Sequence, residues 1–488
     1  MSKDAPIVIV GAGVFGLTSA IHLARRGYTK ITVFDRQPYH ETWYDFDKGC
    51  DAASADRNKI IRAAYGDEVW YQNLTLQAID EWEGWNATLA AGKDLPPGMT
   101  AQDRIYVNCG TYRMGDESST SLSPFEERSI HNLTAAGRGQ TQYLLHQPGE
   151  VARARADGFA HGIDPFQLAD KTDGDEGEHR GYLDMIGGFV YADKACRFAL
   201  HLAQQLGVTC VLDSQAGQFV GFVEEESSEH GSTATRRVVG IRTADGKQHR
   251  ASITILACGG WTPSLLPAMD GLCETTAGSI ATLSIPDYLR ERFSPDNFPV
   301  WLYRQPGGSG GDLYGFPVDE QGVMKLGYRG TKFTNPQVQA VDGRFRSVPI
   351  TRWTRPDSIT GLPAQSLRVI RGFLDAYLPE LRANGVEVSD TRLCWYTDSF
   401  DNQFVVDNVP GREGLLVATG GSGHAFKFLP VLGRFVADRV EGIDSDLLRR
   451  WRWRKLQEGE KPHNGFMTGP RDAKALQNVQ FEGDVSKL

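Results

Sequence analysis

The sequence predicts an α/β fold in which a discontinuous Rossmann-like domain is joined to an α+β domain built on an antiparallel or mixed sheet. Ile7–Val10 is a continuous β-branched run, which is typical of a strand buried on both faces. This run leads directly into a glycine turn, residues 11–16, and a helical pattern and a second strand, residues 31–35, follow. Between about residues 275 and 395 the composition changes to aromatic-rich strands and a helix, which indicates a second domain.

Composition limits the classes of function. A chain of 488 residues with 40% hydrophobic content can bury a large core, and the net charge of −9 gives no overall basic surface for nucleic acid or anionic lipid. Small molecules are therefore the expected partners. No apolar run approaches the roughly 20 residues that a membrane span needs, and a soluble, intracellular protein is expected. The seven cysteines are scattered without a C-x-x-C pair, so neither disulfides nor a metal site are expected.

The glycine turn predicts dinucleotide binding. Three glycines at this spacing permit a tight turn and close approach of the backbone to a pyrophosphate, which the N-terminus of the following helix attracts. Asp35 ends the second strand, where a carboxylate can bind ribose hydroxyls. The turn alone does not distinguish NAD from FAD. The residues expected at this end of the cofactor are Gly11, Gly13, Val14, Phe15, Gly16, Asp35 and Arg36.

Later segments favour FAD. Residues 253–261 resemble the strand-then-glycine element that flavoproteins place beside the cofactor, and residues 414–421 form another buried strand that runs into glycines. We therefore predict an FAD-binding domain made of three segments and a substrate domain made of two. The predicted boundaries are 1–90, 186–274 and 396–450 for the FAD-binding domain, 91–185 and 275–395 for the substrate domain, and 451–488 for a C-terminal tail.

Two motifs carry a family resemblance. The first is Cys394-Trp395-Tyr396-Thr397, and the second is the stretch from Gly421 to Lys427, with the sequence GSGHAFK. With the glycine turn, they resemble the monomeric sarcosine oxidase family, which includes the pipecolate and saccharopine oxidases and the fructosyl amino acid oxidases. The resemblance extends to about residue 442 and weakens in residues 100–185 and in the tail.

The resemblance implies that FAD is attached covalently. In that family a cysteine at the position of Cys394 forms a thioether to the flavin 8α carbon. A lone cysteine before a tryptophan is otherwise most simply a small buried hydrophobe. The resemblance also implies contacts between the flavin and Thr397, Gly421, Gly423, His424 and Lys427.

The resemblance assigns three basic residues to the substrate and the flavin. Lys59 would lie near the flavin, and Arg62 would bind the substrate carboxylate, for which a guanidinium fork is well matched. Lys427 would supply a second positive charge for that carboxylate. An ordinary solvated residue in a charged helix is the alternative for Arg62. Fructosyl amino acid oxidases commonly lack an arginine at this position, which favours the sarcosine and pipecolate branch.

Four further residues receive roles by resemblance. Lys325 would promote oxygen reduction near flavin N5, because a fixed ammonium stabilises superoxide in a desolvated site. Tyr314 and Tyr396 would contact the substrate, although core packing is a competing interpretation for both. His424 is either a catalytic proton carrier or a packed, hydrogen-bonded residue, and the sequence leaves this open.

Together these residues imply an amine oxidase that converts the C–N bond of a secondary amine, such as an N-substituted amino acid, to an imine and reduces O2 to H2O2. The expected enzyme is of the same type as the saccharopine, pipecolate and sarcosine oxidases. One alternative is a tailoring oxidase that acts on an N-methyl aromatic amino acid with ring closure, and another is a fructosyl amino acid oxidase. An NAD-dependent dehydrogenase and a redox-inactive flavin-binding module are further alternatives, but the dehydrogenase leaves Cys394 unexplained.

The last three residues suggest a location. Ser486-Lys487-Leu488 is a peroxisomal address when it stands at the C-terminus. We therefore expect recognition by the peroxisomal import receptor, the chance occurrence of this tripeptide in a polar tail being the alternative. A peroxide-producing oxidase would suit that compartment.

Overall fold

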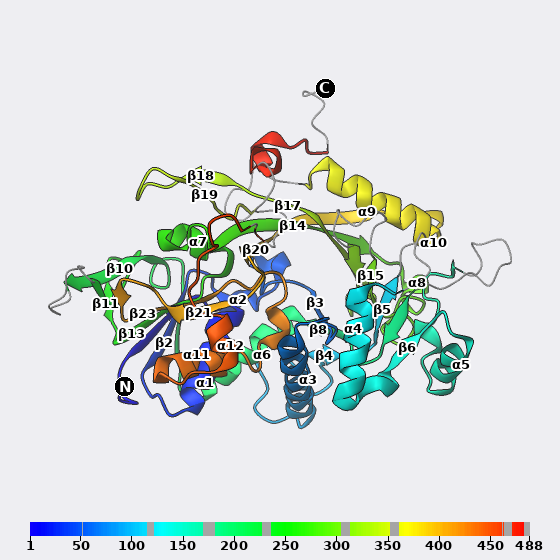
Figure 1. The fold of residues 1–488 in the computed structure, drawn as a ribbon, viewed down its shortest axis with the longest axis horizontal. Coiled ribbons are helices and arrows are strands. Elements are labelled where there is room, and N and C mark those ends of the chain that lie inside the picture. Colours follow the sequence, from blue (N-terminus) through cyan, green and yellow to red (C-terminus); the bar gives the residue numbers. More distant parts are fainter. Residues whose placement is uncertain are drawn as a thin grey trace.

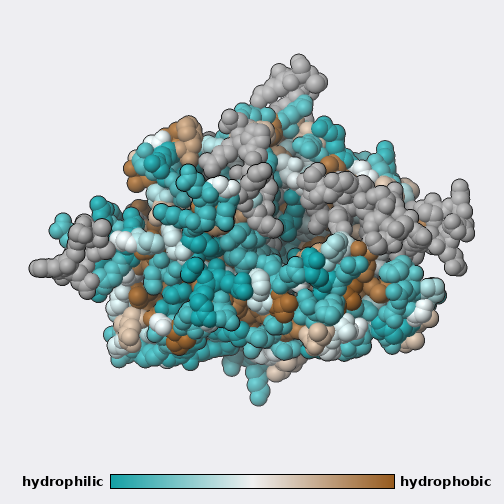
Figure 2. All heavy atoms as spheres, viewed as in Figure 1, coloured by the Kyte–Doolittle hydropathy of each residue, from teal (hydrophilic) through white to brown (hydrophobic). Residues whose placement is uncertain are grey.

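The computed structural model describes residues 1–50, 52–114, 122–168, 181–226, 236–303, 313–351, 361–460, 462 and 471–482 (Figure 1). Ser486-Lys487-Leu488 lies outside these residues. Within them, no helix has both the length and the apolar character that crossing a bilayer requires. Among the residues that the structure describes, no three or more His, Cys, Asp or Glu side chains form a group that could hold a metal ion. On the face drawn in Figure 2, outside the grey atoms, apolar residues are scattered among hydrophilic ones.

A six-stranded sheet forms the base of the first domain. Five of its strands are parallel, because β1 pairs with β2 and β13, β2 with β9, and β13 with β23, whereas β21 joins the edge antiparallel. Four strands of the parallel part are buried along most of their length, as expected for a sheet covered on both faces, whereas only the last residue of the edge strand β9 is buried. In sheet order they are β21 (Val405–Asn408), β23 (Leu415–Thr419), β13 (Ile253–Leu256), β1 (Ile7–Val10), β2 (Ile31–Asp35) and β9 (Thr209–Leu212).

Different layers cover the two faces of this sheet. On one face α1 packs against α6 and α11, and their apolar residues share a core with Ile7 and Ile9. On the other face β11 contributes Val238 and Ile241 to a core with Val8. The elements of these layers are α1 (Val14–Arg25), α6 (Ala192–Gln205), α11 (Gly433–Glu441), β10 (Phe219–Glu226), β11 (Arg236–Thr243), β12 (Gln248–Arg250) and β22 (Arg412–Glu413).

An eight-stranded mixed sheet forms the second domain. All neighbouring pairs are antiparallel except β5 and β15. Helix α9 (Ala364–Tyr377) lies on its upper face in Figure 1 and packs on β17. In sheet order the strands are β20 (Val388–Ser399), β14 (Cys273–Ser284), β17 (Val323–Phe333), β16 (Leu313–Gly315), β15 (Val300–Tyr303), β5 (Thr111–Met114), β7 (Tyr182–Asp184) and β6 (Gln142–Leu144).

Smaller elements connect and extend the two domains. A three-stranded sheet has the order β3 (Asn58–Ile61), β8 (Gly188–Tyr191) and β4 (Tyr106–Val107), and β18 (Pro336–Val338) pairs with β19 (Phe345–Ser347). In Figure 1 the three-stranded sheet lies below the eight-stranded sheet, beside the long helix α3 (Val69–Ala90). The remaining helices are α2 (Tyr39–Thr42), α4 (Pro124–Leu133), α5 (Pro148–Ala156), α7 (Thr262–Leu265), α8 (Asp287–Arg290), α10 (Pro379–Ala383) and α12 (Asp446–Arg450).

The predicted fold class is confirmed, with local differences. The strands of the six-stranded sheet fall in the three segments assigned to the first domain, although the exact domain boundaries stay a prediction. Arg62 directly follows strand β3, so it does not lie on the charged helix that the alternative interpretation assumed.

Close backbone packing holds the glycine turn in place. Gly11 has a φ of +105°, and a Cβ added there would lie 2.5 Å from the carbonyl oxygen of Ala257, at the end of β13. A Cβ on Gly16, in α1, would lie 1.7 Å from the carbonyl oxygen of Gly11. The first helix can therefore approach the turn only because residue 16 has no side chain.

We predict that Gly16→Ala lowers the free energy of unfolding by about 1–3 kcal/mol, because the new methyl group meets backbone that cannot rotate away. Gly84→Ala is the matched control, since Gly84 also lies inside a helix, α3, with nothing within 4 Å of an added Cβ. The control should gain about 0.5–1 kcal/mol from helix propensity. Chemical denaturation of both variants measures the difference, and equal stability of the two would contradict the packing of α1 on the turn.

Candidate active site

Two cavities meet between the two domains. One, of about 470 Å³, is lined by the glycine turn at one end and by residues 421–426 at the other, and we call it the glycine-turn cavity. The second, of about 460 Å³, is lined by several lysines and arginines, and we call it the cationic cavity. Both are lined by Lys59, Tyr396, Gly423, His424 and Phe426. The two cavities therefore adjoin at these residues.

The first end of the glycine-turn cavity contains the residues predicted around Asp35. Gly11, Gly13, Val14, Phe15 and Arg36 all line it, whereas Gly16 lies behind it in the helix. The Asp35 carboxylate accepts hydrogen bonds from the backbone N–H of Ala12 at 2.7 Å and of Gln37 at 2.9 Å. Burial raises the pKa of Asp35, and these two N–H groups oppose that effect. The carboxylate thus stabilises the turn itself, and its side chain also lines the cavity.

The aromatic side of this cavity is formed by Trp261. The Arg36 guanidinium lies 4.1 Å from the centre of the Trp261 ring, within the range of a cation–π contact. Both residues line the glycine-turn cavity. Trp261 ends the strand-then-glycine segment, residues 253–261, and Arg36 directly follows β2. Two segments that the sequence linked to the cofactor therefore lie side by side at this cavity.

The other end of the glycine-turn cavity is formed by β20 and the loop after β23. Thr397 and Gly421 line it, and the Thr397 hydroxyl is buried with no hydrogen-bond partner among the described residues. Cys394 is buried, at 1% exposure, and lies three residues earlier on the same strand. Its side chain lines neither cavity, but it lies within electrostatic range of Lys59 and Lys325.

These features fit the adenosine end and the flavin end of FAD. The turn at Gly11 brings backbone close to the cavity, and the N-terminus of α1 directs N–H groups toward it, as a pyrophosphate requires. The orphaned Thr397 hydroxyl is a polar group in need of a partner at the far end. We therefore find that the residues present suit an extended dinucleotide.

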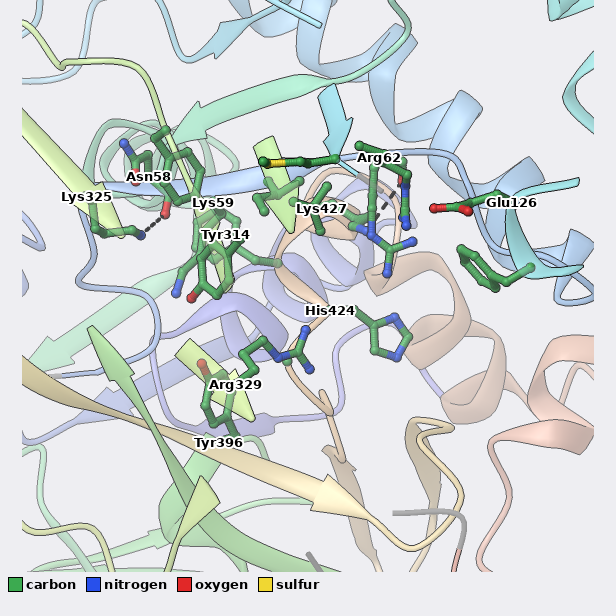
Figure 3. A pocket seen from close by; sticks show the side chains of 18 of the residues that line it. Asn58, Lys59, Arg62, Glu126, Tyr314, Lys325, Arg329, Tyr396, His424 and Lys427 are labelled. Atoms are coloured by element: carbon green, nitrogen blue, oxygen red, sulfur yellow. Dashed lines mark hydrogen bonds between the residues drawn. The ribbon is translucent and has the colours of Figure 1, made fainter. Parts of the chain in front are cut away.

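One face of the eight-stranded sheet forms a wall of the cationic cavity. Successive residues of a strand point to opposite faces, so Lys325 and Arg329 on β17 share a face, whereas Leu326 points into the core beneath α9. Across the sheet, Tyr314 lies opposite Gly327 and Leu302 opposite Tyr314. Figure 3 shows the result, with Tyr314, Arg329 and Tyr396 projecting into one space.

Glycines make room for the two predicted substrate tyrosines. A Cβ on Gly327 would lie 2.1 Å from the Tyr314 ring, and one on Gly278 would lie 2.8 Å from the Tyr396 hydroxyl. Each tyrosine therefore lies across a glycine of the neighbouring strand. Burial raises the pKa of Tyr314 to about 12 and that of Tyr396 well above its usual value, so both hydroxyls are protonated donors at neutral pH.

Asp56 joins the two lysines at one end of the cavity. Its carboxylate lies 2.8 Å from Lys59 Nζ and 3.0 Å from Lys325 Nζ, and Lys325 also donates to the carbonyl of Asn58 at 2.5 Å. Burial alone would raise the pKa of Asp56, but the two lysines hold it well below its usual range. Burial lowers the pKa of Lys325 to about 8 despite Asp56, whereas Asp56 raises that of Lys59.

A hydrogen-bond chain fixes the state of His424. Lys427 Nζ donates to the Tyr65 hydroxyl at 2.9 Å, and that hydroxyl lies 3.1 Å from His424 Nδ1. His424 Nε2 lies 3.0 Å from the carbonyl oxygen of Asn402, which can only accept, so Nε2 carries the proton. Nδ1 therefore accepts from Tyr65. Burial, with Lys427 nearby, lowers the pKa of His424 well below its usual value, which favours this neutral form.

Arg62 and Lys427 lie close together (Figure 3), and both contact Tyr65. The Arg62 guanidinium lies 4.9 Å and Lys427 Nζ 4.8 Å from the centre of the Tyr65 ring, and Arg62 also donates to the carbonyl of Ala64. Burial lowers the pKa of Lys427 well below its usual value, and Arg62, Arg329 and Arg113 lower it further. Two adjacent cations at one end of a cavity are suited to bind a carboxylate.

Sequence reasoning missed Asn58, Arg113 and Arg329, which line this cavity, and Tyr65, which bonds to its lining residues His424 and Lys427. Arg329 had a usable signal, because it lies four residues after Lys325 on one strand and therefore on the same face. Arg113 lies in the region where the family resemblance is weak, and Tyr65 carries no local signal. Both side-chain polar atoms of Asn58 are buried with no hydrogen-bond partner among the described residues.

The protein has a Rossmann-like sheet with a glycine turn, a cavity that fits a dinucleotide and an adjoining substrate-sized cavity. These features define a dinucleotide-dependent oxidoreductase. Residues 6–439 match the family model described as DAO, FAD dependent oxidoreductase. The chain belongs to this family, and it is an FAD-dependent oxidoreductase.

Individual proteins are similar over nearly the whole chain. An L-saccharopine oxidase of Schizosaccharomyces pombe is 28% identical, over 92% of this chain and 93% of its own length. The amino acid oxidase imqH of Aspergillus flavus is 27% identical, over 91% and 94%. The solved structure of a fructosyl peptide oxidase from E. terrenum superposes with a TM-score of 0.74 at 25% identity, covering 98% of each chain.

Proposed function

We propose that this protein is a flavin-dependent amine oxidase that oxidises the C–N bond of a secondary amine carrying a carboxylate. The observation that carries the proposal is the contact between the two cavities. Arg62 and Lys427, a cation pair suited to a carboxylate, line the cavity that meets the FAD-sized cavity at Tyr396 and His424. The similarity to an L-saccharopine oxidase supports the same class of reaction.

The chain's own residues supply binding and orientation. Arg62 and Lys427 bind the carboxylate, and the tyrosines Tyr314 and Tyr396 contact the body of the amine between that carboxylate and the flavin. FAD, which the glycine turn and Thr397 would hold, would supply the acceptor for the hydride equivalent that leaves the carbon next to nitrogen. The amine nitrogen loses its proton, and the resulting imine is hydrolysed or captured internally. Dioxygen takes up the two electrons and two protons and leaves as hydrogen peroxide.

His424 acts as a positioning residue in this scheme. Its Nε2 proton is held by the Asn402 carbonyl and its Nδ1 accepts from Tyr65, so neither nitrogen has a proton to give or an open lone pair for one. The chain from His424 through Tyr65 instead holds Lys427 in place. Of the two roles that the sequence leaves open for His424, we favour the hydrogen-bonded one.

A substrate panel tests the function. We expect anaerobic bleaching of the flavin, and peroxide release in air, with at least one of sarcosine, pipecolate, saccharopine, fructosyl-lysine and an N-methyl aromatic amino acid. Because Arg62 and Lys427 bind a carboxylate, the matching amine without its carboxylate should react far more slowly. The pattern of rates separates the saccharopine and pipecolate type from the tailoring and fructosyl types. A flavin that stays oxidised with the whole panel would contradict the proposal.

We also propose a covalent bond between Cys394 and the flavin. Support comes from its place on β20, two residues before Tyr396 and therefore on the same face, since Tyr396 lines both cavities, and from the nearby lysines Lys59 and Lys325. Cys394→Ala should release the flavin into the supernatant on acid precipitation, whereas the unaltered protein should give a yellow pellet. Cys273→Ala is the matched control, because Cys273 is also buried and lies on the neighbouring strand β14. Retention of the flavin in the Cys394→Ala pellet would exclude this attachment.

Lys325 is proposed to assist oxygen reduction. Its ammonium is buried at 1% exposure and lines the cationic cavity, where the first electron transferred to dioxygen creates a negative charge. Lys325→Met should slow reoxidation of the reduced enzyme by about 100-fold. Anaerobic reduction by substrate should change by less than about threefold, since Lys325 lies away from Arg62 and Lys427 in Figure 3.

The pKa of Lys325 gives this step a pH dependence. Because burial lowers that pKa to about 8, the ammonium is present below pH 8 and is lost as the pH rises above it. The reoxidation rate should therefore fall above pH 8 in the unaltered protein and stay flat in Lys325→Met. Lys332→Met is the matched control, since Lys332 is a buried lysine of the same strand that pairs with Asp398. Equal slowing in both variants would refute the assigned role.

The peroxisomal location and the import receptor, inferred from Ser486-Lys487-Leu488, also stay proposals. The release of hydrogen peroxide by the proposed reaction gives a chemical reason for that compartment.

A further inference from the structure

A two-stranded hairpin of the second domain reaches over the glycine-turn cavity. Strands β18 and β19 follow β17, and in Figure 1 they lie above α7, on which β19 packs. Gln339, Val348 and Pro349 line the cavity together with Trp261 and part of α7. We call residues 336–349 the strap. The strap therefore forms part of the wall of the cavity that fits FAD.

One face of the strap is in solvent and the other faces the molecule. Val338 and Phe345 lie opposite each other on the two strands and are 61% and 70% exposed. The neighbouring pair, Gln337 and Arg346, points the other way, because successive residues of a strand alternate between faces. Gln339, directly after β18, lines the cavity. A single hairpin therefore separates this side of the cavity from solvent.

The large apolar side chains of the strap do not fasten it to the protein. A two-stranded hairpin is marginally stable alone, and in this one Val338, Val341 and Phe345 are exposed. The base is fixed to Asn335, whose carbonyl accepts from the Val348 N–H at 3.0 Å and whose side-chain amide donates to the Val348 carbonyl at 2.9 Å. The far end of the strap needs a contact of its own.

Arg346 supplies that contact. It is buried, at 6% exposure, and its guanidinium donates to both carboxylate oxygens of Asp270, each at 2.7 Å. Asp270 directly follows the 3-10 helix Pro267–Met269, in the segment predicted to belong to the first domain. Arg346 also donates to both oxygens of Asp342, at 2.9 and 2.7 Å, but Asp342 belongs to the strap itself. The bidentate pair with Asp270 therefore fastens the strap to the first domain.

We propose that the strap is part of the FAD site, and that the ion pair between Arg346 and Asp270 holds it closed over the bound cofactor. Breaking this pair leaves the strap attached only at its base and lets the cofactor beneath it come into contact with solvent. The inference concerns the retention of FAD and does not rest on the proposed amine oxidation.

Cleavage of bound FAD tests the strap. A phosphodiesterase that cuts the pyrophosphate of accessible FAD is added to the FAD-loaded protein, and the release of AMP is measured. The readout is valid with or without a bond between the flavin and Cys394, because that bond leaves the AMP half free. Asp270→Ala removes both hydrogen bonds across the link and should speed AMP release by about 10- to 100-fold.

Asp342→Ala is the matched control. Asp342 accepts two hydrogen bonds from the same arginine, and its side chain is 29% exposed against 40% for Asp270, but its contact with Arg346 lies within the strap. AMP release should therefore change by less than about threefold. Equal rates in Asp270→Ala and the unaltered protein, or equal acceleration in the two variants, would overturn the proposal.

Amide hydrogen exchange on the same samples separates local opening from unfolding. In Asp270→Ala, exchange should become faster in residues 336–349 and stay unchanged in the buried strands β1 and β13. Faster exchange in the strap without faster AMP release contradicts the proposal, because the strap then opens without exposing FAD. If exchange rises throughout the protein, the comparison is made with Asp270→Asn, which keeps the shape of the side chain, and unchanged AMP release in that variant overturns the proposal.

Discussion

The two-residue period of the β-strand is the constraint on which the site depends. It places Lys325, Gly327 and Arg329 on one face of β17 and directs the intervening residues into the core under α9. The same period on β20 aligns Cys394 with Tyr396. A shift of one residue in the register of either strand would exchange these side chains for apolar ones. The long ladder between β14 and its two neighbours fixes that register.

Asp56 balances the positive charges of Lys59 and Lys325 in the cavity. It lies just before β3, in the first predicted domain, and its partner Lys325 belongs to the sheet of the second. The ion pair therefore joins the two domains at the place where the cavities meet. Its low exposure means that removing Asp56 leaves two buried ammonium groups uncompensated, which is far costlier than losing a surface pair.

The sequence predicted the parts of the protein that local patterns specify. A β-branched run, a glycine turn and an acidic strand end are contiguous, so the first βαβ unit, with Asp35 at its end, could be read directly. The roles of Tyr65 and Arg113 could not be predicted in this way, because they arise from contacts with residues far away in the chain, such as Lys427 and Tyr182. The resemblance to a known family supplied Lys325 and Lys427, but it was weak where Arg113 lies. The tertiary pairing of strands therefore decides the specificity side of the cavity.

The positive charge of the cationic cavity also links binding to protonation. Burial and three neighbouring arginines lower the pKa of Lys427, so the protein without substrate favours loss of a proton from this group. A bound carboxylate brings a negative charge beside Lys427 and restores the ammonium form. Because the two equilibria are coupled, an anionic substrate and a proton favour each other's binding. A cavity of this kind selects against neutral amines, since they leave the repulsion among Arg62, Lys427 and their neighbours unrelieved.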